Sequence, residues 1–132
     1  MPVYTMREAA ELLGVSDDTV RRWADAGRFA VTDREGGHRR VDGRELATFA
    51  RSLATEPAAP GSGAVSARNR LVGIVTDLKR DTVMAQVEMQ CGPYRIVSLM
   101  SREAADELGL EPGVRALASI KSTNVVVELP RD

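Results

Sequence analysis

The spacing of apolar residues changes part-way along the chain. In residues 1–54 they recur every three or four positions, which is the period of amphipathic helices. In residues 66–132 they alternate with polar residues over short runs, which is typical of strands. Residues 55–65 show neither period and collect Pro, Gly, Ser and Ala. We therefore predict two domains, 1–54 and 66–132, joined by a linker over 55–65.

Residues that favour helix ends predict three helices in the first domain. Thr5 and Glu8 have the spacing of a capping box at the start of the first helix, and Gly14 is suited to end it. Ser16 follows as the cap of a second helix, so only about three residues separate the two helices, as in a helix-turn-helix. Asp42 is placed to cap the third helix.

The second helix, and a hairpin predicted over residues 29–41 with its tip at 35–37, carry side chains suited to contacting DNA. Short polar and arginine side chains on such a helix can reach base edges in the major groove, and a cation cluster on the hairpin suits the DNA backbone or minor groove. Between residues 21 and 44, seven arginines face four acids, which leaves a basic stretch in a chain of net charge −1. The candidate DNA contacts are Ser16, Thr19, Arg21, Arg22, His38, Arg39 and Arg40.

Residues 4–53 resemble the small winged helix-turn-helix domains of excisionase and MerR-type regulators. The matching stretches are YTMREAA at 4–10, VSDDTVRRW at 15–23 and GGHRR at 36–40, the last being the wing signature of that family. The resemblance implies double-stranded DNA as a partner, and Trp23 is interpreted as a core residue. The sequence departs from full-length MerR-type regulators, because no long dimerisation helix follows the third predicted helix.

Five short apolar runs predict strands in the second domain, and Ser101 is placed to cap a short helix that ends near Leu108. Five strands and one helix favour a small OB-like barrel. The fold class expected for the chain is therefore two-domain α+β, with a winged helix-turn-helix followed by an OB-like β-barrel. The expected strands are residues 71–78, 83–89, 94–100, 114–121 and 125–129.

Hydroxyl and cationic residues near the ends of these strands are candidates for binding an anion: Ser66, Arg68, Ser101, Lys121 and Ser122. A tetrahedral dianion needs several directed hydrogen-bond donors and neutralising charge, and hydroxyls, backbone amides and an Arg/Lys pair supply both. The pattern contains no recognisable catalytic constellation, since His38 is the only histidine and Cys91, the only cysteine, has no evident activator. We therefore expect a binding protein without a metal site rather than an enzyme.

Residues 66–129 are similar to the molybdate-binding Mop domain of molbindins and molybdate-responsive regulators, within the TOBE group. The matching motifs are SARN at 66–69, Gly73, ELGLEPG at 107–113 and IKST at 120–123. The resemblance implies assembly through this domain, from a dimer up to a hexamer, with oxyanions between subunits. The chain has one copy of the domain, so another chain would complete each site. The implied ligand is molybdate or tungstate, bound by Ser66, Ala67, Arg68, Ser101, Lys121 and Ser122.

Together these patterns predict a transcriptional regulator whose DNA binding responds to molybdate or tungstate. Two alternatives stay open: an intracellular oxyanion store with a vestigial DNA-binding head, and a DNA-binding regulator whose barrel only forms oligomers. The N-terminus lacks a charged-then-apolar signal pattern, and no apolar run approaches the roughly 18 residues of a membrane helix. We expect a cytoplasmic protein with no membrane contact.

Overall fold

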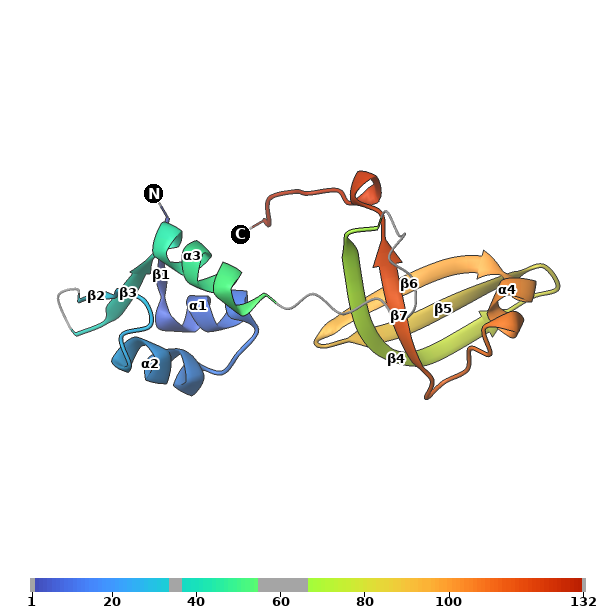
Figure 1. Ribbon diagram of the computed structural model, residues 1–132, viewed down its shortest axis with the longest axis horizontal. Coiled ribbons are helices and arrows are strands. Elements are labelled where there is room, and N and C mark those ends of the chain that lie inside the picture. Colours follow the sequence, from blue (N-terminus) through green and yellow to red (C-terminus); the bar gives the residue numbers. More distant parts are fainter. Residues whose placement is uncertain (1, 34–36, 55–66, 132) are drawn as a thin grey trace. The chain divides into compact units, whose positions relative to one another are not determined.

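The computed structural model describes residues 2–33, 37–54 and 67–131, in two compact units, Met1–Thr55 and Glu56–Asp132 (Figure 1). The linker predicted over residues 55–65 and most of the predicted hairpin tip lie outside the described residues. In the part of the chain that is described, no helix is both long and apolar enough to cross a membrane.

The described part of the first unit has three helices and a small antiparallel sheet with the strand order β1-β3-β2. The predicted helices and the predicted hairpin, formed by β2 and β3, are confirmed. In chain order the elements are β1 (Val3–Thr5), α1 (Met6–Leu13), α2 (Asp17–Asp25), β2 (Thr32–Asp33), β3 (Arg39–Asp42) and α3 (Gly43–Leu53).

The ends of α1 and α2 form as their sequences predict. The Thr5 hydroxyl accepts a hydrogen bond from the Glu8 amide at 3.0 Å, and the Glu8 carboxylate accepts one from the Thr5 amide at 2.9 Å. These bonds from Thr5, the backbone bond first, lower the pKa of Glu8. Gly14 ends α1 with φ of 71°, and the Ser16 hydroxyl caps α2 through the Thr19 amide. Asp42 stands at the N-cap of α3, but its side chain makes no capping hydrogen bond.

Strand β1 was not expected from the sequence, because three residues are too few to show a period of two. It pairs with β3, so that Tyr4 lies opposite Val41 and Thr5 opposite Arg40. This pairing holds β3 beside the start of α1. We call β3 and the residues 37–38 before it the wing.

The core of the first unit is formed by apolar side chains from its helices, from β3 and from the segment after α2. Trp23 packs edge-on against Phe49 with ring centroids 5.2 Å apart, which confirms its interpretation as a core residue. The Arg28 guanidinium lies over the ring of Trp23, 5.7 Å from the centroid. The buried members are Met6, Ala9, Ala10, Val20, Ala24, Phe29, Val41, Leu46 and Phe49.

The second unit is a curled antiparallel sheet with the strand order β6-β5-β4-β7 and one short helix (Figure 1). Its buried core consists of Val75, Val87, Met89 and Cys91. Side chains from β6, β7 and the loop before β7 pack against this core. In chain order the elements are β4 (Asn69–Arg80), β5 (Met84–Cys91), β6 (Tyr94–Ser101), α4 (Arg102–Glu107), β7 (Arg115–Ile120) and the 3-10 helix η1 (Ser122–Asn124).

Two expectations for the second unit are wrong in detail. Residues 125–129 follow η1 as an extended segment outside the sheet, so the described part of the unit has four strands rather than five. The β-branched residues of this run favour an extended backbone, but pairing also needs a partner strand, which the local pattern does not specify. Val83 lies before β5 and is exposed, whereas Ala85, Val87 and Met89 form the buried face as predicted.

Candidate DNA-binding and oxyanion-binding sites

The exposed side of α2 carries four of the residues predicted to contact DNA. The hydroxyls of Ser16 and Thr19 are 2.9 Å apart, and the Arg22 guanidinium donates to the Thr19 hydroxyl at 3.3 Å. Arg21 lies 3.8 Å from the carboxylate of Asp18, a loose pair on the helix surface. Both arginines are exposed, so they can leave these local partners for a ligand at small cost.

The three wing residues predicted to contact DNA differ in their surroundings. His38 is exposed before β3, and Arg40 is half-buried on β3 opposite Thr5. Arg39 is half-buried and forms an ion pair of 2.7 Å with Asp25 at the end of α2. Arg39 therefore ties the wing to α2, in addition to carrying charge on this face.

The first unit contains a hollow of about 470 Å³ between the start of α1, α2 and the wing, which we call the wing hollow. It brings together Arg21, His38, Arg39 and Arg40 of the predicted set. It also includes Arg7, which was not predicted. A signal was present in the sequence, because an arginine in the first turn of a helix opposes the helix dipole. The described residues that line it are Thr5, Met6, Arg7, Arg21, Gly37, His38, Arg39 and Arg40.

Four of the predicted oxyanion-binding residues flank the β4–β7 pair at one end. Asn69 lies opposite Ile120 in the register, and its side-chain amide donates to the Ile120 carbonyl at 3.2 Å. Ala67 and Arg68 immediately precede this pair, and Lys121 and Ser122 immediately follow it. Arg68, Lys121 and Ser122 are exposed, and Ser66 lies outside the described residues. We call residues 67, 68, 121 and 122 the strand-end cluster.

Ser101 lies at the far end of the sheet from the strand-end cluster. It pairs with Met84 at the start of β5, next to the point where β4 ends. The twelve-residue strand β4 separates the two places by roughly 36 Å along its path. The sheet register therefore does not bring Ser101 beside the strand-end cluster of the same chain.

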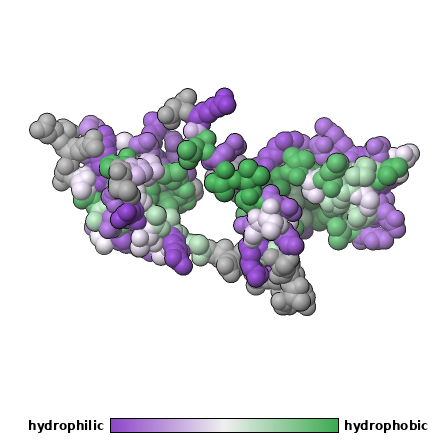
Figure 2. Space-filling model, turned by 90° about the horizontal axis from the view of Figure 1, so that it is seen from above, coloured by the Kyte–Doolittle hydropathy of each residue, from purple (hydrophilic) through white to green (hydrophobic). Residues whose placement is uncertain are grey.

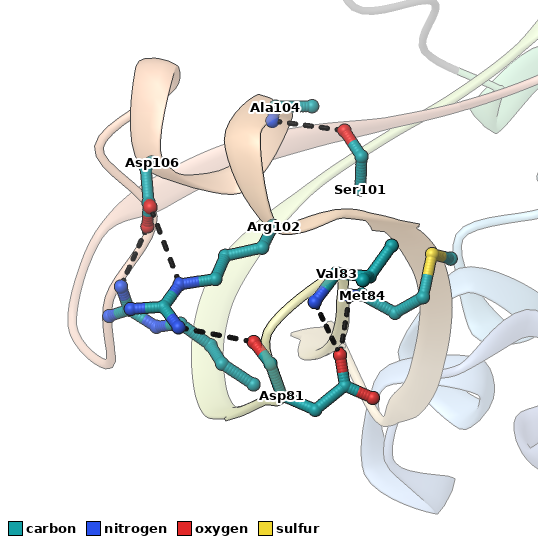
Figure 3. Close-up of polar contacts among 8 residues, drawn as sticks. Asp81, Val83, Met84, Ser101, Arg102, Ala104 and Asp106 are labelled. Carbon is teal, nitrogen blue, oxygen red and sulfur yellow. Dashed lines mark hydrogen bonds and ion pairs between the residues drawn. The ribbon is translucent and has the colours of Figure 1, made fainter.

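The surroundings of Ser101 are ordered by local hydrogen bonds (Figure 3). Its hydroxyl accepts from the Ala104 amide at 3.1 Å and so caps α4, as predicted. Arg102 reaches the Asp81 carbonyl and the carboxylate of Asp106. The shallow hollow here includes one arginine and three acids, which disfavours a dianion. Those four charged residues are Arg102, Glu103, Asp106 and Glu107.

Asp81 organises the turn that leads into β5. Its carboxylate accepts hydrogen bonds from the amides of Val83 at 2.8 Å and Met84 at 2.6 Å (Figure 3). These bonds, the Met84 one first, lower the pKa of Asp81. Among the residues that the structure describes, no group of three or more His, Cys, Asp or Glu side chains could hold a metal ion.

Two family models match the chain, a helix-turn-helix domain over residues 3–54 and a TOBE domain over residues 65–127. The chain is also 39% identical to molybdenum-pterin-binding protein 1 of Clostridium pasteurianum over 64 residues, which are 48% of this chain and 94% of that protein. The chain belongs to the Mop family. Both resemblances found in the sequence are thus confirmed: a helix-turn-helix domain is followed in one chain by a Mop domain of the TOBE type.

Other Mop relatives cover a similar part of the chain. Molybdenum-pterin-binding protein MopA of Rhodobacter capsulatus is 36% identical over 69 residues, which are 52% of this chain and 26% of that protein. Among solved structures, MopII from Clostridium pasteurianum matches with 37% identity and a TM-score of 0.47, covering 50% of this chain and 100% of its own. The molybdate-bound form of the molybdate-binding protein ModG matches with 40% identity and a TM-score of 0.49, covering 51% of this chain and 48% of its own.

Proposed function

We propose that this Mop-family protein is a cytoplasmic transcriptional regulator that binds double-stranded DNA and responds to molybdate or tungstate. The observation that carries the proposal is the union of two units in one chain, a helix-turn-helix unit with a basic wing hollow and a Mop unit. The Mop half alone accounts for 94% of the length of the clostridial relative. The helix-turn-helix unit is therefore an addition to this chain, and it supplies a DNA-reading surface rather than a catalytic one.

The strand-end cluster is our proposed half-site for the oxyanion. Arg68 and Lys121 supply two positive charges, Ser122 supplies a hydroxyl donor, and Ala67 supplies a backbone amide. Ser66 would add a second hydroxyl from just before the described residues. Charge-assisted hydrogen bonds of this kind suit a small tetrahedral dianion. A pterin ring favours an aromatic partner for stacking, and residues 66–70 and 119–124 include no aromatic residue. We therefore favour the oxyanion itself as the ligand.

A second copy of the chain is proposed to complete each site. In the part of the chain that the structure describes, β6 and β7 are the edge strands of the sheet, and a largely apolar hollow of about 730 Å³ opens between them. Figure 2 shows hydrophobic atoms at the surface of the unit that contains these strands.

The extended segment over residues 125–129, which we call the apolar tail, is also exposed, with Val126 at 87% and Leu129 at 89%. Surfaces like these stabilise an assembly when they are buried, so we propose that the tail of one copy covers the hollow of another, in a dimer or a higher oligomer up to a hexamer. In such an assembly, Ser101 would approach an oxyanion from a neighbouring copy.

The coupling between the two functions follows from this assembly. An oxyanion bound between chains stabilises the assembled form by mass action. The assembled form presents two or more helix-turn-helix units, and linked units bind DNA more tightly than a single unit through effective concentration. The sign of the effect on DNA depends on the spacing of the units in the assembly.

The oxyanion site is tested with Lys121→Gln, which removes one positive charge at nearly constant length. We expect molybdate affinity, measured by isothermal titration calorimetry, to fall roughly tenfold or more. Lys79→Gln is the matched control, since Lys79 is exposed near the other end of β4, and it should leave the affinity unchanged. Equal affinities for Lys121→Gln and the wild type would remove the strand-end cluster from the site.

The regulatory function is tested by fluorescence anisotropy with duplexes selected from a randomised pool by the purified protein. Saturating molybdate or tungstate should change the affinity for the selected duplex, whereas sulfate, which is smaller and leaves donors unsatisfied, should not. An affinity that does not respond to molybdate or tungstate contradicts the regulator. Failure to select any duplex, together with tight oxyanion uptake, would identify a store instead.

A further inference from the structure

The wing hollow gathers positive charge from three separate elements of the first unit. Arg7 comes from α1, Arg21 from α2, and His38, Arg39 and Arg40 from the wing, and none of the described residues that line it is an acid. Some of this charge is already balanced nearby. Asp25 holds Arg39, Asp18 lies 3.8 Å from Arg21, and Glu8 faces Arg40. Among the described residues, these contacts involve every arginine of the lining except Arg7.

Arg7 is placed against the electrostatics of its own helix. It lies in the first turn of α1, where the helix dipole is positive and favours acids. Glu8, the acid in that turn, is held by Thr5 in the capping box. Among the ion pairs of the described residues none involves Arg7, and its side chain is exposed. The positive charge of Arg7 therefore does not stabilise α1. An anion bound in front of this turn would attract that charge and make its presence there favourable.

We infer that the wing hollow receives one backbone phosphate of the DNA and that Arg7 is a phosphate-contacting residue. The inference rests on the proposed DNA-binding function and assigns one contact within it. The hollow lies between α2, whose exposed face carries the candidate base contacts, and the wing. The start of α1 also lines the hollow through Thr5, Met6 and Arg7, and the positive end of its helix dipole adds to the attraction for a phosphate.

A phosphate contact makes a prediction that differs from a base contact. Neutralising one phosphate releases condensed counterions, so each such contact contributes about 0.9 to the slope of log affinity against log salt. The contact carries no sequence information, so its loss weakens binding to all duplexes alike. Loss of a base contact would instead change the ranking of duplex sequences.

The experiment compares Arg7→Gln with Arg51→Gln, an exposed arginine on α3 outside the wing hollow. Affinities of the full chain for a selected and an unrelated duplex are measured by anisotropy between about 50 and 200 mM salt. Arg7→Gln should lower the magnitude of the slope for both duplexes, by about 0.9 for each helix-turn-helix unit that contacts the DNA. Arg51→Gln should leave the slope unchanged, and Arg7→Lys, which keeps the charge, should restore it.

Several outcomes overturn the inference. An unchanged slope for Arg7→Gln in a wild type that binds DNA refutes the phosphate contact alone, whereas a wild type that binds no DNA refutes the proposed function as well. A changed ranking of duplexes would make Arg7 a base contact.

Thermal unfolding should show Arg7→Gln to be no less stable than wild type, and a destabilised variant would contradict the electrostatic argument. Inorganic phosphate titrated without DNA should give no heat, and heat that disappears in Arg7→Gln would mark a free-phosphate site instead.

Discussion

At the scale of single residues, Gly73 shows why one position in the Mop motif has no side chain. A Cβ atom at this position would lie 2.4 Å from the Gln90 carbonyl oxygen and 2.6 Å from the Cys91 sulfur. Strand β4 curves here over the end of β5, just before the irregularity between Val75 and Asp77. Since backbone cannot move aside as a flexible side chain can, close packing leaves room for glycine only.

We expect Gly73→Ala to lower the free energy of unfolding by about 1–3 kcal/mol, the usual cost of overpacking. Thr76→Ala, at an exposed position on the same strand, should change it by no more than about 0.5 kcal/mol. Urea unfolding followed by circular dichroism measures both. Equal stabilities of Gly73→Ala and wild type would show that β4 does not approach β5 this closely.

Asp81 gives the second unit a stability that depends on acid pH. Its pKa in the folded chain lies below the ordinary value of 3.8, because the Met84 and Val83 amides stabilise the carboxylate. The unfolded chain therefore takes up the proton first as the pH falls. The stabilisation is complete above the ordinary value and is lost as the pH falls through the pKa of the folded state.

Asp81→Asn should therefore be less stable than wild type at neutral pH, with a gap that narrows at pH values below 3.8. Glu111→Gln is the control at an exposed loop position, and its difference from wild type should not depend on pH in this way. Urea unfolding at neutral pH and at a pH below 3.8 measures the difference in stability between each variant and wild type. A gap for Asp81→Asn that stays constant as the pH falls contradicts the role of its carboxylate.

At the scale of elements, the features that depend on near neighbours in sequence were predictable. The caps of α1 and α2 follow from side chains that bond amides three residues away, and the face of β5 follows from alternation. Strand β1 and the β4–β7 pairing depend on partners far along the chain, which local patterns do not specify. The same limit applies to the candidate sites. Because all the candidate oxyanion-binding residues lie near strand ends in the sequence, they were expected to form one site. Only the register shows that Ser101 and Lys121 lie at opposite ends of the sheet.

The apolar tail is the element whose role is most open to experiment. Deletion of residues 125–132 should lower the molar mass in solution, measured by light scattering, because an exposed apolar segment is proposed to cover a second copy. Deletion of residues 130–132 alone spares the apolar positions and should leave the molar mass unchanged. Circular dichroism checks that both variants fold. An assembly of full size after the longer deletion would exclude the tail from the interface.

At the scale of the whole molecule, a regulator of the proposed kind requires that the Mop unit and the helix-turn-helix unit influence each other. The chain divides into two units with separate cores, so neither needs the other to bury its apolar side chains. The proposed coupling between them passes through the number and spacing of units in an assembly. The overall fold class was predictable because each unit has its own pattern, whereas the assembly depends on contacts with other copies.

The most direct test of this coupling is to measure how DNA changes the affinity for molybdate. Coupling free energy is the same whichever ligand is added first, so DNA must change molybdate affinity by the factor by which molybdate changes DNA affinity. Calorimetric titration of molybdate into the full chain, with and without its selected duplex at the same protein concentration, measures this factor. The account predicts two different molybdate dissociation constants whose ratio matches that from anisotropy. Identical constants with and without DNA would contradict it.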